Sequence, residues 1–338
     1  MGGMEVKDSY RGILHQLEID SRKSYTDIGK ETGSSQQTVS YAVDRMEEEG
    51  IIRSYYPMFD YTKFGYSGYL TLFRVNTFSR ERMEDIVGTL RDNEMTAWVS
   101  RLAGGWDLLV FFLAPNASYF NKEFKELVAK HPEQLRTYSI LTSVVIHDME
   151  RSYLKPGGEE LEKEDTIIGG DRDVFELEEG LQETCRVLNQ DPTRSSVGMG
   201  EELGVTAKTV LDRIDSLEDR KLVKGYRPLL GLPELGASAT LLFVSYTNRD
   251  VEKEDDLVDY CRSHPNATLL MKTFGDWDVM IRIEAETREE NQDVIHSLRE
   301  RFEDVILDYT TLEVREDLEK RYLPPGHFDP DAFLPVQE

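Results

Sequence analysis

The sequence predicts an α+β protein that contains two copies of one domain pair. Each pair is a winged-helix-like helix-turn-helix domain followed by a ferredoxin-like βαββαβ domain. The chain repeats itself at a spacing of about 171 residues, and each copy begins with two short helical patterns around a glycine. Each copy then continues with alternating strand and helix patterns. A length of 338 residues leaves room for two to four compact domains.

The internal repeat shows as identical residues in one register. Shifted by 171 positions, Gly33 falls on Gly204 and Trp106 falls on Trp277. Two of the three tryptophans share this register, which predicts a tandem duplication. A proline- and glycine-containing, acidic stretch between the copies has the composition of a linker. The predicted domains are a first helix-turn-helix at 1–62, a first ferredoxin-like domain at 63–155, an acidic linker at 156–172, a second helix-turn-helix at 173–233, a second ferredoxin-like domain at 234–324 and an irregular tail at 325–338.

The first copy opens with the pattern of a helix-turn-helix. Ser24 is placed to cap one helix, and Gly33 stands where that helix must end and the chain must turn. The next helix has an apolar face at Val39, Val43 and Met46. The second helix of such a motif enters the major groove of DNA by its N-terminal end, where polar side chains contact bases or phosphates. The candidates for DNA contact in this copy are Ser35, Gln36, Gln37, Thr38, Ser40, Tyr41 and Arg45.

The equivalent helix of the second copy carries a different set of side chains. Asp212 and Asp215 stand beside its reading face and would repel phosphate. A helical bundle that does not touch DNA, or that serves as a dimerisation arm, is the alternative interpretation of both motifs, and these two acids give it more weight for the second than for the first. The candidates for DNA contact in this copy are Thr206, Lys208, Thr209 and Arg213.

The rest of each copy follows the order β-α-β-β-α-β of a ferredoxin-like domain. A Gly-x-Trp-Asp element recurs between its two middle strands, at 104–107 and at 275–278. One interpretation is a hairpin turn in which glycine supplies a positive φ and aspartate bonds the turn amides. The other is a close approach of the backbone to a small ligand, which a side chain at the glycine would block. Strands are predicted at 69–75, 96–102, 106–113 and 136–147, helices at 80–92 and 118–130, and the second copy repeats them between 239 and 314.

A helix-turn-helix followed by a βαββαβ domain with Gly-x-Trp-Asp resembles the Lrp/AsnC family of feast/famine transcriptional regulators, here in duplicated form. The resemblance implies effector-sensing domains that pair through their sheets and chains that associate further. Two positions depart from the family pattern: Ala42 stands where an arginine is usual, and Asp276 replaces the glycine kept at Gly105. The resemblance implies binding of an amino acid or a related metabolite at Gly104, Gly105, Trp106, Asp107, Gly275, Asp276, Trp277 and Asp278.

The net charge of −25 speaks against nucleic acid at first sight, because phosphate binding usually shows as a basic patch. Acidic residues are spread over the whole chain, which resembles proteins of halophilic archaea. In a cytoplasm at molar salt an acidic surface maintains solubility, and the Debye length shrinks to about 3 Å. The charge therefore leaves two interpretations open, a salt-adapted DNA-binding protein or a protein that does not bind DNA.

The sequence accordingly predicts a cytoplasmic regulator whose partners are double-stranded DNA, a small effector and further copies of the chain. It contains no apolar run long enough for a membrane span and no secretory signal. Two cysteines without metal-ligand spacing favour neither a disulfide framework nor a zinc site, and no cofactor is expected.

Two other functions remain as alternatives. One is an enzyme similar to the siroheme decarboxylases, which have the same two-domain layout; the six scattered histidines and the lack of a catalytic motif argue against an enzyme. The other is a sensor that acts through protein partners, for example through the acidic run 47–49.

Overall fold

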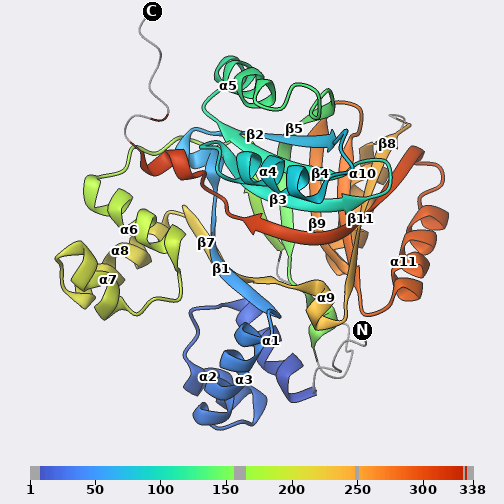
Figure 1. Cartoon of the computed structure of the whole chain (residues 1–338). Coiled ribbons are helices and arrows are strands. Elements are labelled where there is room, and N and C mark those ends of the chain that lie inside the picture. Colours follow the sequence, from blue (N-terminus) through green and yellow to red (C-terminus); the bar gives the residue numbers. More distant parts are fainter. Residues whose placement is uncertain (1–7, 156–164, 248–250, 330–331, 333–338) are drawn as a thin grey trace, which may run out of the picture.

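The computed structural model describes residues 8–155, 165–247, 251–329 and 332. Its elements follow the same order in both halves of the chain (Figure 1). The first half consists of α1 (Asp8–Ile19), α2 (Tyr25–Thr32), α3 (Gln36–Glu48), β1 (Ile52–Phe59), η1 (Tyr61–Phe64), β2 (Ser67–Arg74), α4 (Arg80–Arg91), β3 (Thr96–Ala103), β4 (Leu108–Ala114), α5 (Ala117–Ala129), β5 (Thr137–Met149) and η2 (Ser152–Leu154).

The second half begins with one additional strand, β6 (Asp165–Gly169), and then repeats the series. It consists of α6 (Glu179–Gln190), α7 (Ser196–Leu203), α8 (Ala207–Asp219), β7 (Val223–Leu230), α9 (Leu232–Leu235), β8 (Ser238–Tyr246), α10 (Val251–Ser263), β9 (Ala267–Phe274), β10 (Val279–Ala285), α11 (Arg288–Arg301), β11 (Ile306–Lys320) and η3 (Pro325–Phe328).

The two βαββαβ units form one closed barrel. The strand order is β2-β4-β3-β11-β8-β10-β9-β5, and β5 also pairs with β2, so that the ring closes, while β6 adds to β5 outside it. Within each half the order is that of a ferredoxin-like sheet, β5-β2-β4-β3 and β11-β8-β10-β9. The halves meet along two antiparallel seams, β3 with β11 and β5 with β9. The predicted α+β class and both βαββαβ units are therefore confirmed.

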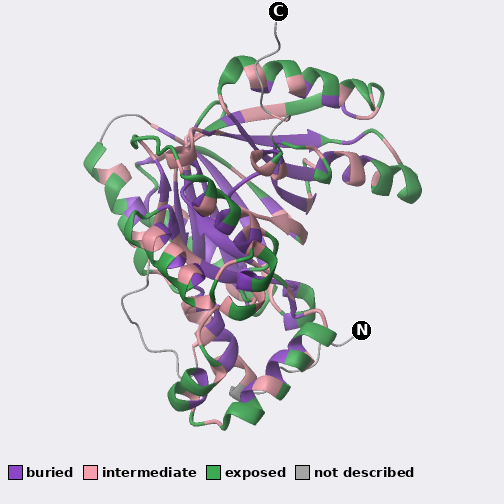
Figure 2. Cartoon of the chain, turned by 90° about the vertical axis from the view of Figure 1, so that its left-hand side faces the viewer, coloured by how far each residue is buried: buried purple, intermediate pink, exposed green. Residues whose placement is uncertain are grey.

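Buried residues gather in the strands of the barrel, while the surrounding helices are exposed along part of their surface (Figure 2). Leu70, Phe111 and Phe243 belong to the core that fills the barrel and continues into the helix-turn-helix units. The outward-facing side chains of the first half pack under α4 and α5, and those of the second half pack under α10 and α11. Alternation of the side chains along each strand thus supplies both the inner and the outer cores.

A two-stranded ribbon joins the halves on the side of the helix-turn-helix units. In it, β1 pairs with β7, and Tyr55 lies opposite Pro228, Tyr56 opposite Arg227, and Pro57 opposite Tyr226. In the 171-residue register of the repeat, Tyr55 corresponds to Tyr226, Tyr56 to Arg227 and Pro57 to Pro228. The first of these pairs is therefore equivalent to the third, and the middle pair is equivalent to itself. The ribbon is therefore two-fold symmetric about the pair of Tyr56 with Arg227, as an isologous contact between two subunits would be.

Two differences from the predicted strand boundaries have a physical reason. Strand β4 begins at Leu108 rather than at Trp106, because Trp106 and Asp107 belong to the turn. Strand β11 continues past 314 to Lys320, because its second part pairs with β3 across the seam.

The stretch predicted as an acidic linker contains β6, although residues 156–164 lie outside the described part of the chain. Strand β6 pairs with β5, and the amide of Gly169 donates to the Asp60 carboxylate at 3.1 Å. The described part of the tail predicted as irregular begins with η3, whose Gly326 amide donates to the Glu94 carbonyl at 3.1 Å.

Candidate nucleic-acid interface and effector turns

The first reader, which consists of α1–α3, has the capping that its sequence predicts. The Ser24 side chain accepts from the Asp27 amide at 3.1 Å, which caps α2. Gly33 ends that helix at φ +67°, in the left-handed region that favours glycine. The Ser35 side chain accepts from the Thr38 amide at 3.1 Å and thereby caps α3. These local bonds fix where α3 starts and therefore which side chains its N-terminal end presents.

The predicted contact residues of the first reader are not equally available. Gln36, Gln37 and Tyr41 are exposed on α3, and Tyr41 keeps 61% of its surface accessible. Ser35 and Thr38 are also exposed, but their hydroxyls bond each other at 2.8 Å. The predicted apolar face of α3 is fully buried. Ser40 is half-buried, and Arg45 pairs with two acids, Glu48 and Glu49.

The acidic run 47–49, which was considered as a contact for a protein partner, has local partners within the first reader or next to it. Arg45 pairs with Glu48 and Glu49, and the Glu47 carboxylate accepts from the Tyr55 hydroxyl at 2.8 Å. The run is thus a solvated helix face with local partners.

The second reader, which consists of α6–α8, repeats this backbone with different side chains. Thr206 caps α8 by accepting from the Thr209 amide at 3.1 Å, and Gly204 ends α7 at φ +66°. Lys208 is exposed, and its ammonium lies 3.9 Å from the Asp212 carboxylate. The guanidinium of Arg213 lies against Gly180 of α6, so close that a Cβ atom there would clash with it. Arg213 therefore packs inside its own reader.

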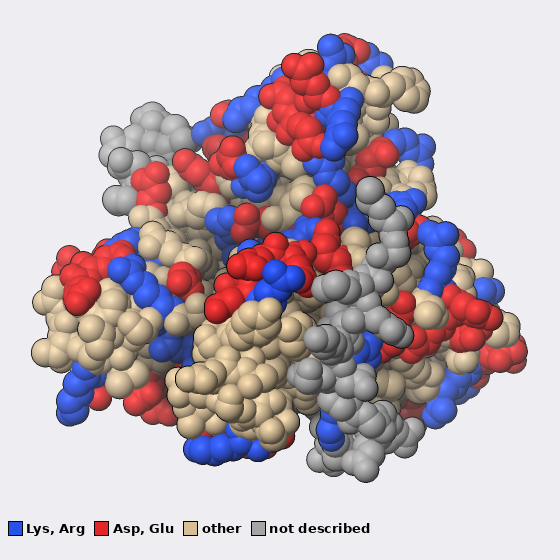
Figure 3. Space-filling view, turned by 60° about the horizontal axis from the view of Figure 1, so that its bottom comes forward, with Lys and Arg blue, Asp and Glu red and all other residues tan. Residues whose placement is uncertain are grey.

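Charge is unevenly distributed around the first reader. The segment from Gln36 to Val43 contains no charged residue, in a chain whose net charge is −25. Figure 3 shows a broad uncharged surface over this reader, bordered by acidic and basic side chains. A phosphate backbone approaching α3 would thus meet little of the repulsion that the rest of the surface exerts.

The glycine turns predicted to hold an effector lie at the two seams between the halves. Gly104 has φ +122°, and a Cβ atom there would lie 3.4 Å from the Leu312 side chain on β11. Gly275 has φ +145°, and a Cβ atom there would lie 2.6 Å from the Leu141 side chain on β5. Both glycines thus face the last strand of the other half, and the approach is tight only at Gly275.

The aspartates of the two turns have the same backbone role. The Asp107 carboxylate accepts from the Val75 amide at 2.7 Å, and the Asp278 carboxylate accepts from the Tyr246 amide at 2.7 Å. The positive φ of both glycines agrees with the hairpin interpretation of Gly-x-Trp-Asp, but the aspartates bond amides at the ends of β2 and β8 rather than the turn amides that it predicted.

The remaining residues of the turns differ between the halves. Arg74 lies over the Trp106 ring at 5.5 Å and donates to the Gly105 carbonyl at 2.9 Å. In the second turn, Ser139 of the first half donates to the Asp276 carboxylate at 2.6 Å, across the seam. Trp277 packs at 6.3 Å from the Phe243 ring. The eight predicted effector residues therefore form two turns with unlike surroundings.

A buried cluster of charges that was not predicted from the sequence lies at the end of the barrel nearest the readers. Arg151 donates to Glu18 of α1 at 3.0 Å and to Glu284 of β10 at 2.7 Å. Arg282 continues the chain of contacts from Glu284 to Asp317 on β11, at 2.6 Å to each. All five side chains are at least 87% buried. The cluster therefore ties α1 of the first reader to the second half of the barrel.

A second group of charges extends this cluster around Asp148. Lys320 donates to its carboxylate at 2.8 Å, and Arg227 and Tyr322 also donate to it. Burial alone would raise the pKa of Asp148, but Lys320 and Arg227 outweigh burial and hold it at about 2. The carboxylate is thus ionised in the folded protein throughout the physiological range.

One signal in the sequence could have revealed these residues. In β10, Arg282 and Glu284 alternate with Ile281 and Ile283, which places two charges on one face of an otherwise apolar strand. Glu18 directly follows Leu17 on the buried side of α1. Charges at such positions need buried partners.

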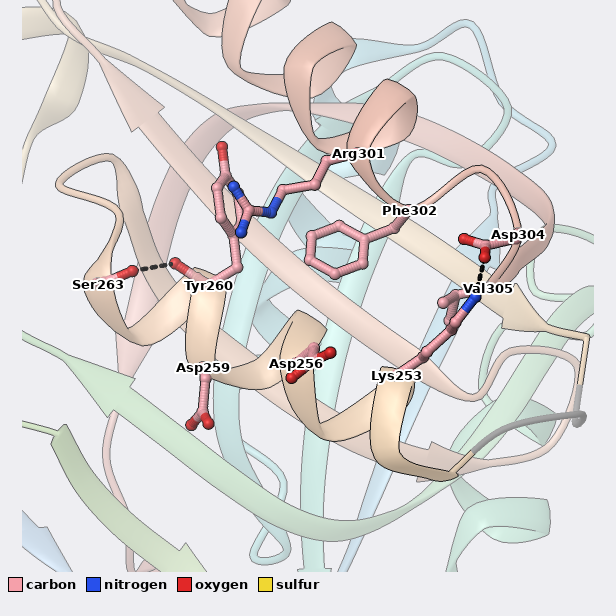
Figure 4. A pocket seen from close by; sticks show the side chains of 9 residues that line it. All are labelled: Lys253, Asp256, Asp259, Tyr260, Ser263, Arg301, Phe302, Asp304 and Val305. Atoms are coloured by element: carbon pink, nitrogen blue, oxygen red, sulfur yellow. Dashed lines mark hydrogen bonds and ion pairs between the residues drawn. The ribbon is translucent and has the colours of Figure 1, made fainter.

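A groove of about 660 Å³ lies on the outside of the second half, between α10 and α11 (Figure 4). Arg301 lies 5.0 Å from the Tyr260 ring, and Lys253 pairs with Asp304 at the other end. None of the eight predicted effector residues lines this groove.

The described cysteines are buried, and the histidines have protein partners. No cluster of three or more His, Cys, Asp and Glu side chains that could hold a metal occurs in the described ranges. Cys185 and Cys261 are free and buried, and burial raises the pKa of the Cys185 thiol to about 12. Each of the six histidines hydrogen-bonds or pairs with a protein group. No helix in the described part of the chain is long and apolar enough to cross a membrane.

Comparisons with known proteins connect the first reader to DNA. Residues 10–53 match the family of winged helix-turn-helix DNA-binding domains. An uncharacterised HTH-type transcriptional regulator of Pyrococcus furiosus is 25% identical over 126 residues, which cover 37% of this chain and 84% of that protein. One from Pyrococcus abyssi is 29% identical over 109 residues, which cover 32% of this chain and 72% of that protein.

One solved structure matches the architecture of both halves together. The siroheme decarboxylase NirDL superposes with a TM-score of 0.59 and 12% identity, over 95% of this chain and 96% of that one. At this identity the likeness concerns the fold alone. The winged helix-turn-helix match and the two archaeal relatives support a DNA-binding transcriptional regulator.

Proposed function

We propose that this chain is a sequence-specific DNA-binding transcriptional regulator whose first reader contacts the major groove through α3. The observation that carries the proposal is the uncharged, exposed N-terminal end of α3 within a matched winged helix-turn-helix. Gln36, Gln37 and Tyr41 are the side chains best placed for base edges, and Ser35, Thr38 and Ser40 lie beside them. Lys208, Thr206 and Thr209 would take part from the second reader, whereas Arg45 and Arg213 are engaged locally.

Fluorescence anisotropy tests the proposal, with the full chain and DNA from upstream of its own gene, in molar KCl and with random DNA as competitor. At molar salt the counterion-release contribution is weak, so base contacts must supply much of the affinity. We expect the upstream DNA to bind in preference to random DNA. Equal binding to both, or no binding to either, would contradict a sequence-specific regulator.

Gln37→Ala tests the contact surface itself. The change should cost on the order of 1–3 kcal/mol of binding free energy at a specific site, because it removes a bidentate contact to a base. Gln292→Ala on α11 is the matched control, since it removes an exposed glutamine far from the readers. Equal affinities of the two variants would remove Gln37 from the reading set.

The effector is a separate part of the proposal. An amino acid or related metabolite would bind at one or both turns, at Gly104–Asp107 and Gly275–Asp278. Their position at the seams supports this, because a ligand there would touch both halves and bias how they associate with each other or with further copies of the chain. Tryptophan fluorescence during titration with the twenty amino acids is the test, and Trp106→Phe and Trp277→Phe separate the two turns. Unchanged emission with all twenty would contradict amino-acid sensing here.

An enzyme of the siroheme decarboxylase type is the second candidate, favoured by the fold match to NirDL over both halves. The six histidines weigh against it, because each of them already bonds or pairs with a protein group. An absorbance titration with siroheme distinguishes the candidates, because a saturable spectral shift would favour the enzyme.

Two aspects of origin complete the proposal. The 171-residue register and the symmetric ribbon support a tandem duplication, and the dispersed acidic residues support a cytoplasm at molar salt. Thermal unfolding at increasing KCl tests the latter. A midpoint that does not rise with salt would contradict it.

A further inference from the structure

The two recognition helices, α3 and α8, leave their turns in the same way. Gly33 and Gly204 have φ +67° and +66°, and the capping residues Ser35 and Thr206 have φ and ψ values within 1° of each other. The hydroxyls of Ser35 and Thr206 bond those of the residues three positions later, at 2.8 and 2.9 Å. The second residue of each helix therefore leaves the backbone from the same point.

The halves of the chain are also placed as the subunits of a two-fold dimer would be. The β1–β7 ribbon is symmetric about Tyr56 and Arg227, and the seams repeat each other: Ala103 pairs with Glu313, and Thr142 pairs with Phe274. These two pairs are related by the shift of 171. The pseudo-two-fold axis makes α3 and α8 equivalent, so they would meet two half-sites of opposite orientation.

The chemistry at the equivalent positions is not symmetric. Gln37 corresponds to Lys208, and both side chains are exposed, with 85% of the Lys208 side chain accessible. An amide offers a donor and an acceptor, which match N6 and N7 of adenine, whereas an ammonium offers donors only, which match O6 and N7 of guanine. A symmetric homodimer would present the same group to both half-sites.

We infer that the chain reads a non-palindromic operator, with adenine opposite Gln37 in one half-site and guanine opposite Lys208 in the other. This inference rests on the proposed DNA-binding function. The next reading position strengthens the asymmetry, because Ser40 in the first reader corresponds to Leu211, which is 45% exposed. An apolar side chain there fits a thymine methyl group and makes no hydrogen bond. Asp212 lies 3.9 Å from the Lys208 ammonium, too far for a hydrogen bond that would hold the side chain away from DNA.

Selection of binding sites from a random DNA library tests the inference, with the full chain in molar KCl. The wild-type chain should select two half-sites that differ at one position, adenine in one and guanine in the other. Lys208→Gln should replace that guanine with adenine and make the site palindromic, and Gln37→Lys should give guanine in both half-sites. Each exchange should alter the preference between the two bases on the order of tenfold, as measured by anisotropy.

Lys30→Gln is the matched control, because it removes one positive charge from an exposed position of α2 outside the recognition helix. It should leave the selected bases unchanged. A palindromic wild-type site, a footprint confined to one half-site, or base preferences that neither exchange alters would overturn the inference while the regulator function stands. A wild-type chain that selects no DNA would overturn the proposed function, and the inference would fall with it.

Discussion

The two readers share a backbone but differ in how they are attached to the barrel. Glu18 of α1 bonds the buried Arg151, and His15 of the same helix bonds Glu150 at 2.6 Å. The residue equivalent to Glu18 in the second reader is Asn189, whose buried side-chain oxygen has no hydrogen-bond partner in the described parts of the chain. Arg151 itself corresponds to Tyr322. Turns and caps thus hold the shape of both readers, and among the described residues the ion pairs with the barrel core come from the first reader.

The barrel interior shows the same contrast. Arg282 and Glu284 on β10 correspond to Phe111 and Leu113 on β4, and Asp317 on β11 corresponds to Ile146 on β5. Identical strand geometry therefore accommodates a charged wall in one half and an apolar wall in the other. Because both walls belong to one chain and meet along its seams, they can specialise together.

The largest expected effect comes from removing the shared guanidinium. Arg151→Ala would leave Glu18 and Glu284 buried beside fewer cations, and breaking a buried pair costs about 3–5 kcal/mol. Urea denaturation measures the loss. Arg186→Ala in the second reader is the control, because its pairs with Glu183 and Glu202 are on the surface and should contribute less than about 1 kcal/mol. Similar losses of unfolding free energy in both variants would show that the buried ion pairs of the first reader contribute no more than the surface pairs of the second.

Acid should weaken the contact that η3 makes with the first half. Burial lowers the pKa of His327 to about 4 from an ordinary value of 6.5, where its ring accepts from or donates to Tyr66 at 2.9 Å and packs against Phe64. The unfolded chain therefore binds a proton first, and stability falls as the pH drops from 6.5 towards 4, by on the order of 2–3 kcal/mol.

His327→Phe should flatten that part of the stability curve, as measured by denaturation at a series of pH values. The folded-state pKa of Asp148, at about 2, is below its ordinary value of 3.8, so its own contribution is lost only below about pH 4. The steep part below pH 4 should therefore remain in the variant. A variant as sensitive as the wild type between pH 6.5 and 4 would show that another group titrates there.

The two glycine turns should differ in their tolerance of a side chain. Gly275→Ala would place a Cβ atom 2.6 Å from Leu141 and 3.2 Å from the Ile140 carbonyl, whereas Gly104→Ala would meet Leu312 at 3.4 Å. Both substitutions strain a positive φ, at a cost of about 1–3 kcal/mol, and the first adds a steric clash. Thermal unfolding should show the larger loss for Gly275→Ala. The opposite order would mean that the β5 seam yields more readily than the β11 seam.

The smallest loss of stability is expected from removing the N-caps of α3 and α8, and it should be equal in the two halves. Ser35→Ala and Thr206→Ala each remove an N-cap bond of the same length, which is worth roughly 1 kcal/mol. Hydrogen exchange of the amides at Thr38 and Thr209 would show whether both caps open to the same extent. A clear difference would mean that attachment to the barrel, and not local capping, controls the start of the recognition helix.

Local signals in the sequence predicted most of the fold. The glycines at 33 and 204, the capping serine at 24 and the βαββαβ order were all correct, because each depends on neighbours within a few residues. The 171-residue register predicted the equivalence of the halves. Pairing between β1 and β7, the strand within the acidic linker and the closed ring depend on contacts between distant segments, and no local pattern specifies them.

The sites were predictable to different degrees. The exposed positions of α3 follow from helical periodicity, since the apolar face at Val39, Val43 and Met46 fixes the opposite face. The engagement of Arg45 and Arg213 could not be predicted, because it depends on which neighbour each long side chain meets. The aspartates of the turns were identified by their recurrence, and their partners are backbone amides, which carry no sequence signal.

Because the ring is closed within one chain, pairing of the two halves does not depend on protein concentration. Both seams, β3 with β11 and β5 with β9, join strands of the same chain, so pairing of the halves is a first-order event. Dilution cannot separate them, and a cell holding only a few molecules keeps every one of them paired. Closure also fixes the stoichiometry, because no mixture of like and unlike halves can form by exchange.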